Sequence, residues 1–169
     1  MKISARTRYG LRILLDIAQH EQNESPRTIG AIAASQNISA AFISRLAVPL
    51  KRAHLIRAER GAGGGLRLAR SPEDITILDI SETLDGPVSV LKCLTAPQTC
   101  RRHAKCPARS VWADLNATIK NALATVTLAN VMKLTRISSS SLAARTRCPR
   151  CTSCCGRRTT SMNASMTKA

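Results

Sequence analysis

Apolar residues return every three or four positions near the start of the chain. Leu11, Leu14, Leu15 and Ala18 share one helical face, and charged and amide side chains occupy the positions between them. This periodicity predicts an amphipathic helix over residues 5–20.

Two further helices are expected next, joined by a tight turn. The apolar pattern TIGAIAASQ can begin a helix between Pro26 and Thr28, and it ends around Asn37. Ser39 then offers a side-chain oxygen that can cap a third helix, SAAFISRLAVPLKRAHL. Two short helices in this order predict a helix-turn-helix unit.

A proline stands inside the third helix. An interior proline removes a hydrogen bond and clashes with the preceding turn, at a cost on the order of 3 kcal/mol. The helix therefore either kinks at Pro49 or ends its recognition portion near Val48.

The residues that follow predict a hairpin and a short helix. A β-prone run, Leu55–Glu59, precedes the glycine-rich turn RGAGGG, and LRLAR then alternates apolar and basic residues before Pro72. We expect this hairpin to be the wing of a winged helix. The stretch TILDISETLDG predicts a further helix that stops at Gly86.

The most regular apolar pattern lies between residues 108 and 133. Its members are separated by 4, 3, 4, 3, 4 and 3 residues, which is a heptad-like seam: Ala108, Trp112, Leu115, Ile119, Ala122, Val126 and Ala129. Such a seam can pack back on its own domain, but we expect it to pair with the same helix of a second subunit, giving a homodimer.

These patterns predict a mainly α fold, a winged helix-turn-helix with a small β-hairpin wing and a long C-terminal dimerisation helix. We expect a winged helix-turn-helix domain over residues 1–86, a cysteine loop over 87–107, the dimerisation helix over 108–133 and a basic Ser/Thr/Cys-rich tail over 134–169.

The net charge of the chain indicates what kind of partner it binds. The chain of 169 residues has a formal net charge of +16, which indicates a polyanionic partner. Nucleic acid fits better than a membrane surface, because the apolar N-terminal stretch LRILLDIAQH is broken by Arg12 and Asp16 before it could act as a signal segment. We therefore expect a cytoplasmic protein without a membrane partner.

Basic residues cluster on the predicted recognition unit. Any one of them could be an ordinary solvated charge, but together they form a phosphate-neutralising footprint for duplex DNA. Sequence readout would fall to Ser39, Ser44 and Arg45 at the exposed start of the third helix. The expected DNA-binding residues are Ser39, Ser44, Arg45, Lys51, Arg52, Arg60 and Arg67.

The RGAGGG turn at the predicted wing tip is not a nucleotide-binding loop. Leu66 stands where a dinucleotide fingerprint needs its last glycine, and no Lys-Ser/Thr pair follows as in a P-loop. Glycines flanked by Arg60 and Arg67 suit a hairpin tip that approaches DNA closely, although a tight turn with solvated arginines is the plainer alternative.

Three cysteines lie in the basic loop LKCLTAPQTCRRHAKCPARSVW. Six and five residues separate Cys93, Cys100 and Cys106, which is looser than the C-x-x-C of structural zinc and suits an iron–sulfur cluster. Neighbouring lysines and arginines would lower thiolate pKa values and offset the charge of such a cluster. Redox-active free thiols and an incidental surface loop remain alternatives. A fourth ligand could be His103, water, a small thiol or a side chain of the partner subunit.

The tail differs in composition from the rest of the chain. No acidic residue follows Asp114, and the Ser/Thr/Arg/Cys-rich text from Thr135 onward has too few large apolar residues to form a core, so we expect disorder. Its CPRCTSCC segment has spacing that could bind zinc. The abrupt change also suggests a reading-frame shift, which resequencing the 3′ end of the gene would test.

In these residues the chain resembles the redox-responsive winged-helix regulators that include an iron–sulfur cluster regulator and a nitric-oxide-sensitive repressor. The resemblance covers roughly residues 1–133 and is carried by MKISARTRYGLRILLDIA, by ISAAFISRLAVPLKRAHLIRAERGAGGGLRLARSP, by the three-cysteine loop and by SVWADL. It implies a homodimeric regulator, usually a repressor, that binds a double-stranded DNA operator and whose cluster state changes its DNA affinity.

Several positions depart from the family pattern. The family usually has tyrosine at Leu66 and glycine at His54, and Ser44 replaces a glutamate that influences operator choice. Arg109 and Arg8 stand where the histidine and aspartate cluster ligands of the two named types would be. The resemblance therefore assigns neither the operator nor the cluster type (2Fe-2S or 4Fe-4S) nor the signal.

Three other functions are alternatives to the cluster-dependent repressor. The first is a clusterless regulator whose cysteines sense redox state directly, and the second is an architectural DNA-binding protein without operator preference. The third is an enzyme with a cysteine nucleophile, which lacks any base other than His103. We expect no enzymatic activity.

Overall fold

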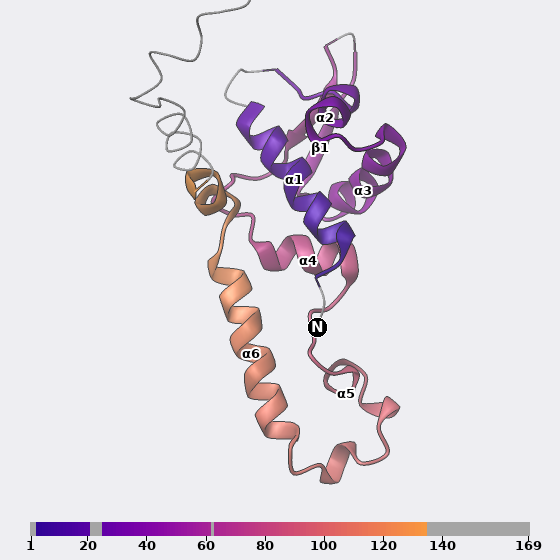
Figure 1. Cartoon of the computed structure of the whole chain (residues 1–169), viewed down its shortest axis with the longest axis vertical. Coiled ribbons are helices and arrows are strands. Elements are labelled where there is room, and N and C mark those ends of the chain that lie inside the picture. Colours follow the sequence, from indigo (N-terminus) through magenta and orange to yellow (C-terminus); the bar gives the residue numbers. More distant parts are fainter. Residues whose placement is uncertain (1–2, 21–24, 62, 135–169) are drawn as a thin grey trace, which may run out of the picture. The chain divides into compact units, whose positions relative to one another are not determined.

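The computed structural model describes residues 3–20, 25–61 and 63–134. The chain folds as a mainly α winged helix with one antiparallel hairpin, which confirms the predicted fold class (Figure 1). The helices and strands are α1 (Ala5–His20), α2 (Ile29–Gln36), α3 (Ala40–Arg52), β1 (Ile56–Glu59), β2 (Gly65–Leu68), α4 (Ile77–Asp85), α5 (Lys92–Thr95) and α6 (Arg109–Thr125), with short 3₁₀ turns at Pro97–Thr99 and His103–Lys105.

One apolar core joins the first four helices to the hairpin. The inward face of α1 carries Ile13, Leu14 and Ile17, each at most 1% exposed. Helix α1 also approaches α4 closely at Gly10, where a Cβ atom would overlap Leu84 Cδ1. The fully buried side chains of the core are Ile13, Leu14, Ile17, Ile32, Ile43, Leu46, Leu50, Leu55, Ile75, Ile80 and Leu128.

Side-chain caps fix the boundaries of the helix-turn-helix. Thr28 Oγ1 accepts a hydrogen bond from Ala31 N and begins α2, and Asn37 ends that helix in the left-handed region at φ 52°. Ser39 Oγ then accepts from Phe42 N and begins α3, as the sequence predicts. The turn between α2 and α3 is therefore three residues long, which sets the angle at which α3 leaves α2.

Helix α3 does not end at its proline. It continues through Pro49 to Arg52, so the proline does not end the helix. Burial explains this result, because Leu46, Ala47 and Leu50 on either side of Pro49 are all buried in the core. After the helix, His54 adopts φ 53°, a left-handed conformation that favours glycine.

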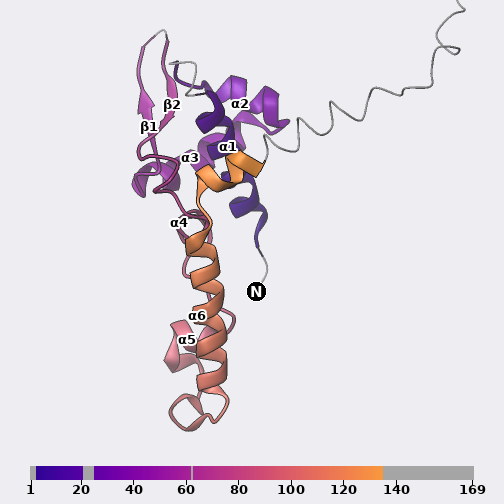
Figure 2. The same cartoon turned by 90° about the vertical axis from the view of Figure 1, so that its left-hand side faces the viewer.

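The wing is a regular hairpin, and a third segment joins it near its turn. Ile56 pairs with Leu68 and Arg57 with Arg67, and Figure 2 shows the two strands side by side. Arg27, ahead of α2, exchanges two backbone hydrogen bonds with Leu66, of 3.0 and 2.8 Å. Gly65 is needed at this contact because a Cβ there would lie 2.7 Å from the Arg27 carbonyl oxygen.

Helix α4 is capped at both ends. Thr76 and Asp79 form a capping box, with each side chain accepting a hydrogen bond from the other residue's backbone N–H, and Gly86 at φ 85° ends the helix as predicted. The cysteine loop follows as short helical turns, in which none of the residues of α5 is buried.

The helix expected over 108–133 is interrupted. Helix α6 ends at Thr125, and a second helical segment begins at residue 128. Between them Thr127 forms a bridge to Thr76, while Val126 O accepts from Ile77 N and Ile75 O accepts from Leu128 N. Leu128 is then fully buried, so core packing ends the seam before Val126 and Ala129 can continue it.

No helix in the part of the chain that the structure describes is long and apolar enough to cross a membrane. The predictions for the tail, including its CPRCTSCC segment, fall on residues outside the described ranges.

Candidate DNA-binding surface and cysteine loop

The outer face of α3 combines small, polar and basic side chains. Ser44 and Arg45 are exposed, and Val48 is 49% exposed one turn further on. Ser39 is exposed too, although its hydroxyl oxygen already caps the helix, and Ser44 Oγ donates to Ala40 O at 2.9 Å. The structure therefore leaves all three predicted readout residues exposed, with Ser44 and Arg45 adjacent on the outer face of α3 and Ser39 at its N-cap.

Arg45 is held over an aromatic ring. Its guanidinium lies 5.9 Å from the centroid of Phe42, and Phe42 packs edge-on against Tyr9 of α1 with ring centroids 5.6 Å apart. The same Tyr9 ring receives Arg8 and Arg12 at 5.3 and 5.5 Å. Because a ring restrains a guanidinium without consuming its hydrogen-bond donors, Arg45 keeps those donors for a ligand.

Some of the other basic residues are exposed, and one of them makes structural hydrogen bonds. Lys51 and Arg52 are exposed at the end of α3, and Arg60 is exposed at the start of the wing turn. Arg70, the last residue of the LRLAR stretch, instead donates to the carbonyls of Ala53 and His54, both at 3.2 Å. It caps the C-terminal end of α3, because those carbonyls have no partner within the helix.

A carboxylate occupies the outer face of the wing. Arg57 and Arg67 lie directly opposite each other in the hairpin register, and Glu59 shares their face. Glu59 Oε1 lies 3.0 Å from Arg67 Nε and 3.5 Å from Arg57 Nη2. The predicted DNA-binding Arg67 is thus ion-paired, and its side chain is 18% exposed.

Asp16 joins the helix-turn-helix to the wing. This carboxylate, 7% exposed on α1, accepts hydrogen bonds from Arg27 Nε at 2.7 Å, from Gln36 Nε2 at 2.8 Å and from Ser35 Oγ. Burial raises the pKa of Asp16, but the three hydrogen bonds and the charge of Arg27 outweigh it, so the pKa is lowered. Arg27 itself pairs with Leu66 of the wing, so one charged group positions both DNA-facing elements.

The three loop cysteines are free thiols of intermediate exposure. Cys93 lies in α5, and Cys100 and Cys106 directly follow the two 3₁₀ turns. Between them, His103 has a buried Nε2 atom without a hydrogen-bond partner. Within the described residues, however, no three His, Cys, Asp or Glu side chains lie close enough together to hold one metal ion.

The segment that enters this loop is tied to α4 and α6. Glu82 of α4 accepts a hydrogen bond from Val88 N at 3.4 Å and pairs with Lys120 of α6 at 2.9 Å. Asn116 of α6 accepts from Val90 N at 3.0 Å. The segment that enters the cysteine loop therefore contacts both helices.

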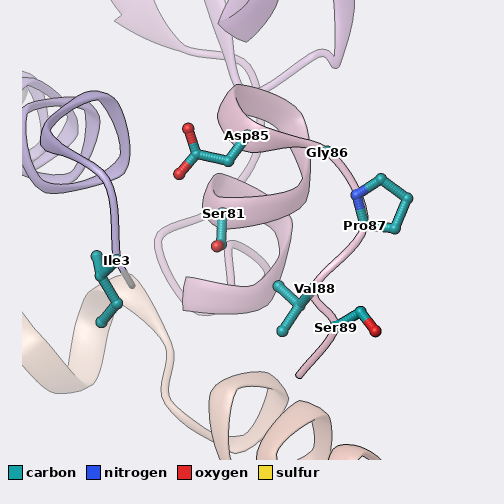
Figure 3. A pocket seen from close by; sticks show the side chains of 7 residues that line it. All are labelled: Ile3, Ser81, Asp85, Gly86, Pro87, Val88 and Ser89. Carbon is teal, nitrogen blue, oxygen red and sulfur yellow. The ribbon is translucent and has the colours of Figure 1, made fainter. Parts of the chain in front are cut away.

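The end of α4 is also linked to α1. The Asp85 carboxylate accepts hydrogen bonds from Ser4 Oγ at 2.7 Å and Thr7 Oγ1 at 2.6 Å. A pocket of about 190 Å³ lies here. Figure 3 shows Ile3 on one side of it, Asp85 and Ser81 on α4, and Val88 on the segment that leads to the cysteines. Helix α4 is thus the common neighbour of the DNA-binding body and the cysteine loop.

Apolar side chains on α6 face outward. Val111, Trp112 and Leu115 are 64%, 40% and 44% exposed, and none of the residues of α6 is buried. The early part of the seam thus presents an exposed apolar surface. Val126, near its end, is 38% exposed, and the buried contact with the domain is made by Leu128, which is not a seam residue.

Three functional features escaped the sequence reasoning. Val48 is exposed four residues after Ser44, and its helical spacing from that serine is the signal that could have found it. Glu59 and Arg57 are i, i+2 neighbours on a strand, which predicts a shared face. The Asp16 network has no local signal, because its partners lie 11 to 20 residues away.

Comparison with known proteins identifies the family. The family model described as Rrf2, an iron-dependent transcriptional regulator, matches residues 3–134. Protein rrf2 of Nitratidesulfovibrio vulgaris is 37% identical over 133 residues, covering 79% of this chain and 88% of that protein. The transcriptional regulator IscR of Vibrio atlanticus is 32% identical, covering 79% and 76%.

A solved structure agrees with both. CymR, the global cysteine regulator of B. subtilis, superposes with a TM-score of 0.67 at 32% identity, covering 79% of this chain and 98% of that one. These relatives are transcriptional regulators rather than enzymes. With its winged helix-turn-helix and its match over nearly all described residues, the chain belongs to the Rrf2 family of DNA-binding transcriptional regulators.

Proposed function

We propose that the protein is a homodimeric repressor that binds a pseudo-palindromic operator, with α3 in the major groove and the wing alongside. The observation that carries this proposal is the accessible face of α3, where Arg45 is restrained over Phe42 with its donors available. Arg45 would read a guanine, Val48 could contact a thymine methyl group, and Ser39 and Ser44 would add polar contacts.

Phosphate contacts would fall to basic residues around this face. Lys51 and Arg52 at the end of α3 and Arg60 and Arg67 on the wing are the proposed set. The exposed apolar surface of α6 would bury itself against the same helix of a second subunit, which would space two α3 helices along the DNA. We infer a cytoplasmic location because an operator-binding regulator acts where the DNA is.

We further propose that Cys93, Cys100 and Cys106 hold an iron–sulfur cluster. The donor chemistry fits: three free thiols stand in a basic loop, and the unpartnered His103 Nε2 adds a nitrogen donor among them. Because the described thiols are not gathered around one point, holding the cluster requires the loop to close. When bound, the cluster would supply sensitivity to redox state, iron or nitric oxide.

The loop's own contacts indicate how closure would reach the DNA. Closing it would pull on the hydrogen bonds from Val88 N to Glu82 and from Val90 N to Asn116. These join the loop to α4 and α6, so the spacing of the two α3 helices in a dimer would change. The mechanism is a bias between two dimer geometries.

A second candidate keeps the DNA binding without the cluster. Three partly exposed cysteines that do not share a metal-binding arrangement favour direct thiol oxidation as the signal. A solved relative, CymR of B. subtilis, is described as a global cysteine regulator.

Spectroscopy separates the two candidates. We expect protein purified without oxygen to be coloured and to contain iron and sulfide, and Cys93→Ala, Cys100→Ala or Cys106→Ala to remove the visible absorbance. Colourless, iron-free protein whose operator affinity changes on oxidation would favour the thiol candidate. Competition with random DNA tests the regulator itself, for which we expect a specificity ratio of about 10³ or more. A ratio under about 10 would indicate an architectural protein.

A further inference from the structure

The outer face of the wing carries three charges in a small area. Arg57 and Arg67 are cross-strand partners, so two like charges stand directly opposite each other, an arrangement that destabilises a hairpin. The Glu59 carboxylate relieves this repulsion, with one oxygen 3.0 Å from Arg67 Nε and 3.5 Å from Arg57 Nη2. The same carboxylate reduces the charge of the trio to +1.

This trio lies on the face turned away from the core. Leu66 and Leu68 of β2 and Ile56 of β1 point inward and are buried, whereas Arg57 is 62% and Glu59 38% exposed. A phosphate approaching the wing would therefore meet Arg57 beside the carboxylate, because the Arg67 side chain is only 18% exposed. To bind it, Arg57 must exchange its carboxylate contact for the phosphate, and the remaining Glu59 charge repels the DNA.

We propose that Glu59 limits the affinity of the wing for DNA by competing with phosphates for Arg57 and by placing a negative charge beside it. The inference rests on the proposed contact between the wing and DNA. The consequence is a lower affinity for DNA of any sequence. Non-specific binding is mostly phosphate neutralisation, so a chain with a net charge of +16 would otherwise bind any DNA tightly. Glu59 thus adjusts total affinity, while α3 supplies the choice of sequence.

The test compares Glu59→Gln with a matched control in the full-length protein. Glu73→Gln makes the same change in net charge at an exposed position between the wing and α4. Binding to a fluorescent random duplex is measured by anisotropy across a range of salt concentrations. If Glu59→Gln frees Arg57 for one more phosphate, the slope of log K against log salt steepens by about 0.9. Taking the affinities of the variant and wild type as equal at about 1 M salt, the affinity of the variant in 0.1 M salt is then about eightfold higher.

Two further variants make the outcomes distinct. Glu59→Asp retains the charge and should bind within about twofold of wild type, and Glu73→Gln should do the same. The inference is overturned if Glu59→Gln binds random DNA no more tightly than wild type, or with the same affinity as Glu73→Gln. Arg60→Ala tests the underlying contact separately: if it leaves DNA binding unchanged as well, the proposed wing contact itself is wrong.

Discussion

Removing the Asp16 carboxylate should destabilise the helix-turn-helix and the wing together. Asp16→Ala leaves Arg27, whose side chain is only 22% exposed, without its ion-pair partner, and removes the acceptor of hydrogen bonds from Ser35 and Gln36. Breaking a buried ion pair from one side costs about 3–5 kcal/mol, and the partial exposure of Arg27 puts this case near 3 kcal/mol.

The assay is urea denaturation followed by circular dichroism, with Asp74→Ala as control because Asp74 is an exposed aspartate. We expect Asp16→Ala to lower the free energy of unfolding by about 3 kcal/mol and the control to change it by less than about 0.5 kcal/mol. Equal effects of the two substitutions would refute the reasoning that Asp16 anchors these elements.

The same carboxylate predicts a dependence on pH. Because the pKa of Asp16 is lower in the folded state, its contribution is fully present above the unfolded pKa of about 4 and is lost as the pH falls below that value through the folded pKa. Wild-type stability should therefore fall more steeply below about pH 4 than that of Asp16→Ala. Parallel curves would contradict this linkage.

The remaining predictions concern the backbone, the dimer and the readout. His54→Gly should raise the free energy of unfolding by up to about 1 kcal/mol in thermal melts, since glycine adopts φ 53° without strain; a loss of stability would argue against strain there. Leu115→Glu should convert dimer to monomer in sedimentation velocity, whereas Asn121→Glu, an exposed position about 120° round α6 from Leu115, should not; an intact Leu115→Glu dimer would exclude this surface. Arg45→Ala should cost about 1–3 kcal/mol of operator binding but little binding to random DNA in competition assays, and an equal loss on both would reassign Arg45 to phosphate.

Most of the fold could be predicted because its signals are local. Thr28, Ser39 and Gly86 set helix boundaries through contacts with their own neighbours in the chain, and hydrophobic spacing alone places α1. The interruption after Thr125 could not be predicted, because the heptad-like spacing continues past it. Only the burial of Leu128 against a core assembled from residues 13–84 ends the helix there.

The candidate site could likewise be predicted only in part. Charge clustering located the recognition unit, yet it could not distinguish Arg70, which caps α3, from the exposed Lys51, because both are simply basic in the sequence. The ion pairing of Arg67 depends on a hairpin register that brings Glu59 beside it. The cysteine ligands remain a prediction from spacing and resemblance.

The central claim is that the cysteine loop changes how tightly α3 and the wing hold an operator. The direct measurement is operator affinity, under anaerobic conditions and at one salt concentration, of wild type and of a variant with Cys93, Cys100 and Cys106 all changed to alanine. The account predicts affinities that differ at least tenfold, and a response to oxidant or nitric oxide in wild type alone. Equal affinities with equal responses would contradict it.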